Sequence, residues 1–70
     1  MELTRKELII IHECLESHAE TLIEEIRSAE DDLENPYDHE TKMMIRKYLT
    51  NKRTRLADTY KILVKIFSSF

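Results

Sequence analysis

The chain has 70 residues, of which 36% are charged and 41% hydrophobic, with no glycine and a single proline, Pro36. The tight turns of β-hairpins and the phosphate-binding loops of nucleotide-binding folds usually contain glycine. Its absence therefore argues against a β-sheet protein and against a nucleotide-binding fold. The net charge of −3 hides a division, because residues 1–35 carry eleven acidic and three basic side chains and residues 36–70 carry eight basic and three acidic ones.

The size and the cysteine content limit the class of protein further. Seventy residues form one domain at most. A hydrophobic core of this size gives little stability by itself, so we expect a further source of stability such as self-association. Cys14 is the only cysteine, so an internal disulfide is excluded and a reduced, intracellular protein is indicated. No apolar run approaches the about 20 residues of a membrane span, and the N-terminus lacks a secretory signal pattern. We therefore expect a cytoplasmic protein.

The first expected helix covers about residues 4–33. Thr4 and Glu7 have the spacing of a capping box, in which each side chain binds the other residue's backbone N–H. Apolar residues then recur in steps of three and four, and on a straight helical wheel they form one stripe. This stripe consists of Leu8, Ile11, Leu15, Ala19, Leu22, Ile26, Ala29 and Leu33.

A turn is expected at about 34–38, because Pro36 cannot donate a helical hydrogen bond and disfavours helical geometry at Asn35. Two starts are possible for the second helix: Asn35 as the cap with Pro36 in the first turn, or Asp38 as a later cap. This helix is expected to run to about residue 67. Its apolar stripe reads Ile45, Leu49, Lys52, Leu56, Tyr60, Leu63, Phe67 and Phe70, with Lys52 as the one polar member.

Two helices of similar length joined by a short turn predict an all-α, two-helix antiparallel hairpin that forms a single domain over residues 1–70. Leucine-type residues recur every seven positions in both helices, which favours coiled-coil packing. We also expect two hairpins to pair into a four-helix bundle, because one hairpin leaves apolar residues outside both stripes. The expected dimer or partner interface comprises Ile9, Ile10, Met44, Tyr48, Ile62, Ile66, Phe67 and Phe70.

Acidic residues of the first helix project away from its apolar stripe and form what we call the acidic ridge, interrupted by Arg27. Such a ridge could bind a basic surface of a partner protein. In most long helices, however, a charged face of this kind is simply the face exposed to solvent. The basic residues of the second helix are spread around it, so direct nucleic-acid binding is disfavoured. The ridge consists of Glu13, Glu16, Glu20, Glu24, Asp31 and Glu34.

Cys14 and His18 lie one helical turn apart and are both good zinc ligands, but two ligands do not make a site and His39 lies far along the chain. The same pair lacks the oxyanion loop and orienting group of a nucleophilic catalyst. The sequence therefore predicts no metal, no cofactor, no small-molecule substrate, no membrane association and no enzymatic activity.

By elimination, we expect a small non-enzymatic regulator or inhibitor that binds a larger protein, of the kind that bacteria and phages direct against host proteins. It would act through the exposed apolar residues and the acidic ridge. The alternatives are a self-assembling structural protein and, less favoured, a nucleic-acid-associated dimer.

Overall fold

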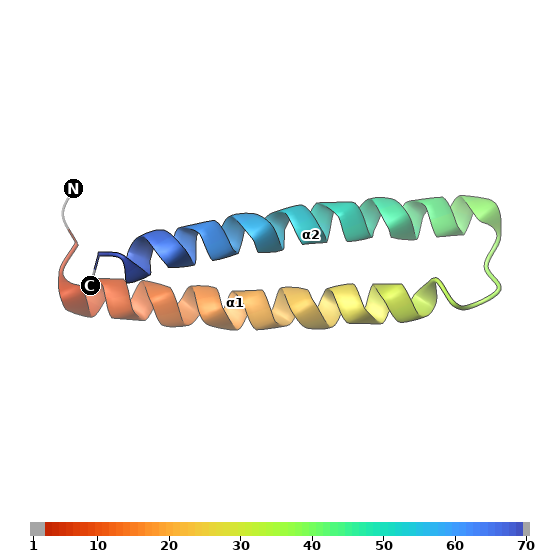
Figure 1. Ribbon diagram of the computed structural model, residues 1–70. Helices are drawn as coiled ribbons and strands as arrows, with labels where there is room; N and C mark the ends of the chain where they lie inside the picture. The colour runs from red at the N-terminus through yellow and green to blue at the C-terminus, as the bar shows by residue number, and fades with distance from the viewer. Residues whose placement is uncertain (1–2, 70) are drawn as a thin grey trace.

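The computed structural model describes residues 3–69. They form two helices, α1 at Arg5–Asp32 and α2 at His39–Phe67, and no strand occurs between residues 3 and 69. The helices lie antiparallel along their length, so that both chain termini lie at one end and the connecting loop at the other (Figure 1). The hairpin is a rod of 51 × 16 × 15 Å. The predicted all-α, two-helix hairpin is therefore confirmed.

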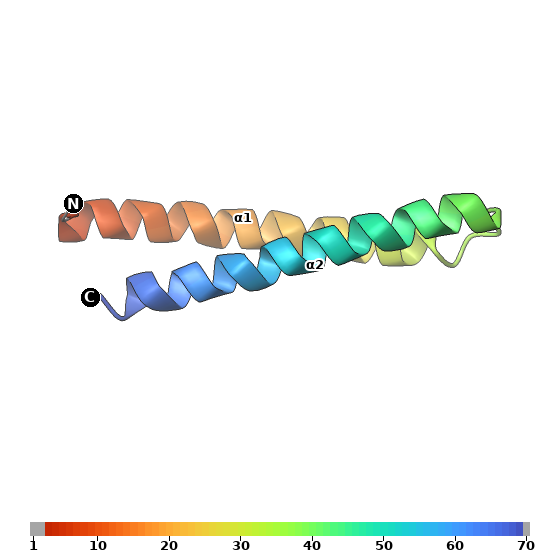
Figure 2. The same ribbon diagram turned by 90° about the horizontal axis from the view of Figure 1, so that it is seen from above.

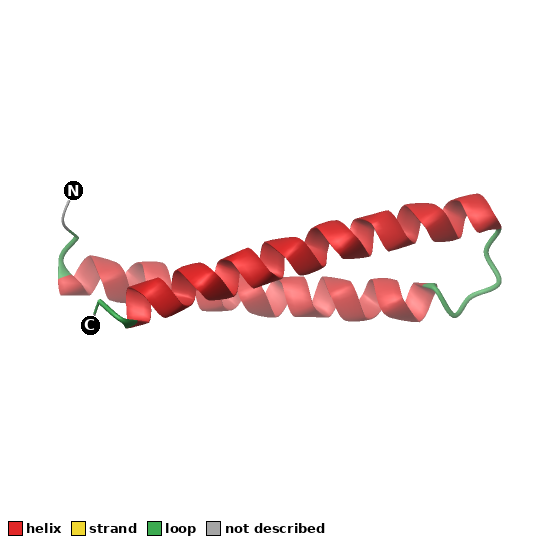
Figure 3. Ribbon diagram, turned by 45° about the horizontal axis from the view of Figure 1, so that its top comes forward, coloured by secondary structure: helices red, strands yellow, loops and turns green. Residues whose placement is uncertain are grey.

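The two axes are inclined to one another, as the views from above and from an intermediate angle show (Figures 2 and 3). The main buried cluster, Ile26, Ala29 and Leu49 with the half-buried Leu33, Ile45 and Leu56 around it, lies towards the loop. Towards the termini Leu63 is buried and Leu8, Leu15 and Ile66 are half-buried. We call the end of the rod that holds the start of α1 and the end of α2 the open end.

The helix starts are capped by side chains. The Thr4 hydroxyl accepts a hydrogen bond from Glu7 N (3.1 Å), and Thr4 N donates to the Glu7 carboxylate (3.0 Å), which confirms the predicted capping box. Asp38 caps α2, since its Oδ1 accepts from Thr41 N at 2.8 Å. Of the two helix starts that the sequence allowed, the structure therefore has the later one, and Pro36 lies in the loop.

The loop between α1 and α2, residues 33–38, is short and contains no glycine. Glu34 N donates to Asp31 O and Asn35 N to Asp32 O, both at 3.1 Å, and Tyr37 N then donates to Asn35 O at 2.8 Å. No residue in the described range 3–69 has a positive φ. The backbone thus reverses by using successive short-range hydrogen bonds rather than a left-handed cap.

The observed helix contact departs from the predicted stripes at three places. His12 is half-buried, whereas Ile11 is 36% exposed. Thr59 is 5% exposed and buried, whereas Tyr60 is 47% exposed, and Phe67 is 68% exposed beside a half-buried Ile66. The predictions for Ile11, Tyr60 and Phe67 as contact residues were wrong by one position each.

The reason is supercoiling. The residues at the observed contact alternate steps of four and three without interruption, as a strict heptad repeat requires. They are 8, 12, 15, 19, 22, 26 and 29 in α1 with 33 at its C-cap, and 45, 49, 52, 56, 59, 63 and 66 in α2. A straight helix drifts about 20° per heptad from such a repeat, so a straight wheel selects a neighbouring residue after a few turns. The Thr59 hydroxyl is satisfied locally by donating to Arg55 O at 2.8 Å.

No helix among the described residues combines the length and the apolar character that crossing a bilayer requires.

Candidate protein-binding surfaces

Apolar residues are unevenly divided between the helix contact and the surface. Over residues 3–69, six hydrophobic residues are buried, whereas twelve large hydrophobic residues remain exposed. Single exposed apolar residues are ordinary, but contiguous groups of them mark interaction sites. The arrangement of these residues therefore decides where a partner would bind.

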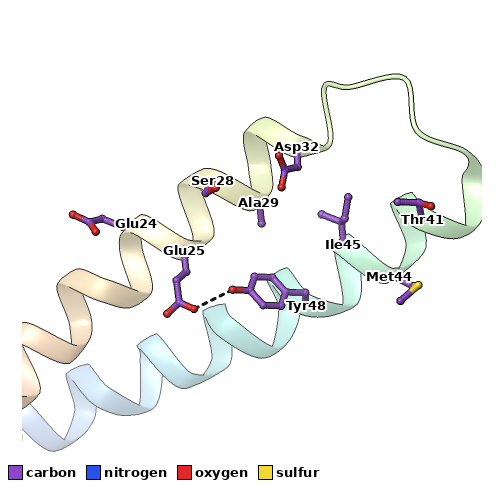
Figure 4. Close-up of a pocket in the computed structure, with 9 residues that line it drawn as sticks. All are labelled: Glu24, Glu25, Ser28, Ala29, Asp32, Thr41, Met44, Ile45 and Tyr48. Atoms are coloured by element: carbon purple, nitrogen blue, oxygen red, sulfur yellow. Dashed lines mark hydrogen bonds between the residues drawn. The ribbon is translucent and has the colours of Figure 1, made fainter.

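The first apolar surface is a groove beside the loop, of about 670 Å³. In Figure 4 the side chains of Ala29 and Ile45 lie between the helices, and the Tyr48 ring lies below Ala29. Met44 projects outward and is 70% exposed. We call this surface the loop-end groove, and its lining residues are Glu24, Glu25, Ser28, Ala29, Asp32, Thr41, Met44, Ile45 and Tyr48.

One polar cluster closes this groove on the side of the rod's middle. The Tyr48 hydroxyl donates to Glu25 Oε2 at 3.0 Å, and Lys52 Nζ lies 3.0 Å from the same oxygen. Lys52 Nζ also lies 5.2 Å from the centroid of the Tyr48 ring, within cation–π range. Lys52, the polar member of the predicted apolar stripe, is thus paired across the hairpin.

These contacts shift two pKa values. The hydrogen bonds from Lys52 and then Tyr48 hold the pKa of Glu25 below its ordinary value of 4.5, against a smaller opposing effect of burial. Partial burial and the bond to the negative Glu25 raise the pKa of Tyr48 above 10.0. The cluster therefore stays ionised at Glu25 and neutral at Tyr48 around neutral pH.

The second apolar surface lies at the open end, on the other side of the rod. Phe67 lies against α1, with its ring centroid 6.5 Å from that of His12. Ile9 precedes His12 by one helical turn, and Val64 precedes Phe67 by one turn, so these side chains are neighbours. We call this surface the open-end patch, and it consists of Ile9, Tyr60, Val64 and Phe67, which are 44%, 47%, 64% and 68% exposed.

The structure thus separates the residues that the sequence predicted as one interface. Met44 and Tyr48 belong to the loop-end groove, while Ile9 and Phe67 belong to the open-end patch, and Ile10 is exposed on α1 outside both surfaces. Ile66 is half-buried at the helix contact, Ile62 lies on the groove side because it follows Tyr48 by two heptads, and Phe70 lies outside the described residues. Sequence reasoning missed Ala29, Asp32 and Thr41 as groove residues, because only the antiparallel register brings the end of α1 beside the start of α2.

The acidic ridge is exposed along its whole length. Its members do not all face one way: Glu16 and Glu20 line a shallow hollow with Ile23 and Tyr60, whereas Glu24 lines the loop-end groove. Glu16 also lies 2.6 Å from His12 Nδ1. Acidic side chains therefore adjoin both apolar surfaces.

The basic side chains of α2 are partly engaged with α1. Besides the Lys52–Glu25 pair, Arg53 lies 3.4 Å from Glu30. Exposed ion pairs of this kind contribute a few tenths of a kcal/mol each, so they add little to the stability of the hairpin.

Cys14 is exposed on α1. Over residues 3–69, no three His, Cys, Asp or Glu side chains are grouped closely enough to hold a metal ion.

Comparison of the chain with protein-family models, with curated proteins and with solved structures finds no match. The loop-end groove, the open-end patch and the acidic ridge are therefore the basis for a functional proposal.

Proposed function

We propose that this chain is a small non-enzymatic regulator or inhibitor that binds a larger protein, of the kind phages direct against host proteins, and that two hairpins associate into a four-helix bundle. One observation supports the proposal most: a rod with six buried hydrophobic residues among those described leaves twelve large ones exposed. A core this small is marginal by itself, and such exposed groups are typical of interfaces.

The open-end patch is the surface we assign to the larger partner. Its apolar side chains adjoin the acidic ridge, since Tyr60 lines the same hollow as Glu16 and Glu20. On its other flank the patch adjoins Lys61 and Lys65, which line a hollow with Tyr60 and Val64. A partner that fits would present an apolar strip with basic residues on the side of Glu16 and Glu20 and acidic residues on the side of the two lysines, because an apolar centre with complementary charges at the rim is the usual composition of a protein interface.

A pull-down with matched variants tests the assignment. Val64→Asp should abolish capture of a specific partner from a host extract. Met43→Asp is the control, because Met43 precedes Val64 by three whole heptads, is 55% exposed against 64% for Val64, and lies about 31 Å away at the loop end. Capture that both variants lose equally, or that neither loses, contradicts the assignment, provided circular dichroism shows both folded.

Charge reversal tests the acidic ridge. Glu20→Lys with Glu24→Lys should weaken partner binding, and the loss should shrink as salt rises because exposed charges are screened. Glu40→Lys with Asp58→Lys changes the net charge equally outside the ridge and leaves the Arg53–Glu30 ion pair intact, so it serves as the control. Equal effects of the two double variants would remove the ridge from the interface.

A stable dimer that captures no partner would instead favour the second candidate, a self-assembling structural protein. The exposed apolar residues favour that candidate as well, since they are the surface that a second copy would cover.

A further inference from the structure

The open-end patch belongs to one continuous side of the rod. Arg53 of α2 and Glu30 of α1 form an ion pair there at 3.4 Å. Glu16, Ile23 and Tyr60 line one hollow on the same side. Residues whole heptads apart lie on the same side of a supercoiled helix. We call this side the patch side, and its central residues are Ile9, Glu16, Ile23 and Glu30 on α1 and Arg46, Arg53, Tyr60 and Phe67 on α2.

The two helices bring opposite charge to the centre of the patch side. The central residues of α1 are apolar or acidic, whereas those of α2 are apolar or basic. Within each hairpin Glu16 already pairs with His12, and Glu30 with Arg53. The side chains of Glu16, Glu30 and Arg53 nevertheless remain 56%, 53% and 56% exposed, so their charges still face whatever covers this side.

The flanks of the open-end patch carry opposite charge at one height of the rod. Glu20 adjoins Tyr60 from the side of α1, and Lys61 adjoins Tyr60 and Val64 from the side of α2. Neither Glu20 nor Lys61 belongs to one of the three ion pairs found among residues 3–69. Arg27, which interrupts the acidic ridge, lies one heptad from Glu20 towards the loop, outside the patch. The patch is therefore an apolar strip between an acidic and a basic flank.

We propose that a second copy of the chain covers this side, with a two-fold axis running along the rods, so that α1 of each copy lies on α2 of the other. The inference rests on the proposed self-association and specifies its surface. A two-fold axis makes the contact reciprocal, as a closed dimer requires. Rotation about an axis along the rods leaves every residue at its own height, so Glu20 of each copy approaches Lys61 of the other. Both loops then lie at the same end of the bundle.

Charge decides between the two ways of pairing this side with itself. An axis across the rods would lay α1 on α1 and α2 on α2, which sets Glu16 and Glu30 against a second acidic helix. Like charges in contact are strongly unfavourable. An axis along the rods instead lays the acidic helix on the basic one. It also brings apolar residues together, since Ile23 lies at the height of Tyr60.

The size of the surface is adequate. A side 51 Å long and 15 Å wide is close to the roughly 800 Å² that each partner contributes to a standard interface. The loop-end groove lies on the opposite side of the rod and stays uncovered. Because the open-end patch is also the surface assigned to the larger partner, the second copy and the larger partner would compete for it.

Sedimentation of single variants tests the surface. Val64→Asp should raise the dimer dissociation constant on the order of 100-fold or more, because each dimer then buries two unpaired carboxylates. Met44→Asp is the control, because it introduces the same charge at a position that is more exposed than Val64, 70% against 64%, but lies in the loop-end groove. Equal effects of the two variants would overturn the proposal.

Exchange of charges tests the axis. Glu20→Lys and Lys61→Glu should each raise the dissociation constant on the order of tenfold, since each creates two like-charged contacts per dimer. The double variant should restore the wild-type value, because each pair is then only reversed. Within one hairpin the two residues lie on opposite flanks of the patch, so this coupling can arise only between copies. Asp32→Lys, in the loop-end groove, is the control and should leave the constant unchanged.

Two results of the charge exchange would overturn the proposal. A dimer that Glu20→Lys makes tighter would mean that α1 lies on α1. Losses that add in the double variant, instead of cancelling, would mean that Glu20 and Lys61 do not meet.

The outcomes separate this inference from the proposed function. A wild-type chain that stays monomeric at all concentrations removes both the self-association and its surface, while partner capture through Val64 would stand. A dimer that Val64→Asp and Met44→Asp weaken equally removes only the surface.

Discussion

At the level of single residues, the helix ends are specified by short-range side-chain hydrogen bonds. The side chains of Thr4, Glu7 and Asp38 each accept a hydrogen bond from a backbone N–H three residues away. Such contacts need no tertiary partner, and for this reason the capping box was predictable from spacing alone.

Thr4→Ala should lower the free energy of unfolding by about 1 kcal/mol, the usual cost of a lost N-cap. Urea denaturation followed by circular dichroism measures it. Thr54→Ala is the control, because the exposed Thr54 hydroxyl only donates back to Thr50 O, and this change should be close to neutral. Equal losses in both variants would argue against a contribution from the cap.

Stability should fall in acid through Glu25. Its pKa is lowered in the folded state, chiefly by Lys52 and then by Tyr48, so its contribution is present above the ordinary value of 4.5 and is lost as pH falls through the lower folded value. Glu25→Gln should therefore be less stable than the wild type at pH 7, and the difference should vanish on acidification. Urea midpoints of both proteins from pH 7 down to pH 2 test this, and a difference independent of pH would contradict it.

At the level of the helices, the heptad repeat decides which residues meet. The register places Thr59 at the contact and leaves Tyr60 outside, although Tyr60 is the more apolar choice. One polar residue in the contact is tolerated because its hydroxyl has a backbone acceptor within its own helix.

Thr59→Asp should cost roughly 3 kcal/mol or more and unfold much of the population, because it places an unpaired carboxylate between the helices. Tyr60→Asp should cost far less, since that position is 47% exposed. Thermal unfolding of the two variants side by side measures the difference. The reverse order of stability would support the straight-wheel stripe and contradict the heptad register.

At the level of the whole rod, a narrow helix contact leaves large apolar side chains exposed towards both ends. The buried cluster of Ile26, Ala29 and Leu49 lies near the loop, while Phe67 and Ile10 remain more than half exposed at the other end. A rod built in this way gains stability from any copy or partner that covers its sides.

The melting temperature should therefore rise with protein concentration. Mass action stabilises whatever binds only the folded state, and dimerisation adds this dependence to the hairpin's own stability. Calorimetry or circular dichroism over a hundredfold range of concentration measures the rise, and Val64→Asp should abolish it. A melting temperature independent of concentration in the wild type would contradict self-association.

The order of amino acids was enough to predict the all-helical class, the capping box, the turn around Pro36 and the existence of apolar residues beyond the helix contact. Each of these depends on neighbours within about one helical turn, or on composition. Helix packing, in contrast, was needed to place Thr59 and His12, rather than Tyr60 and Ile11, between the helices, and to assign Met44 and Phe67 to separate surfaces. Those outcomes depend on supercoiling and on the antiparallel register, which arise only when two helices pack against each other.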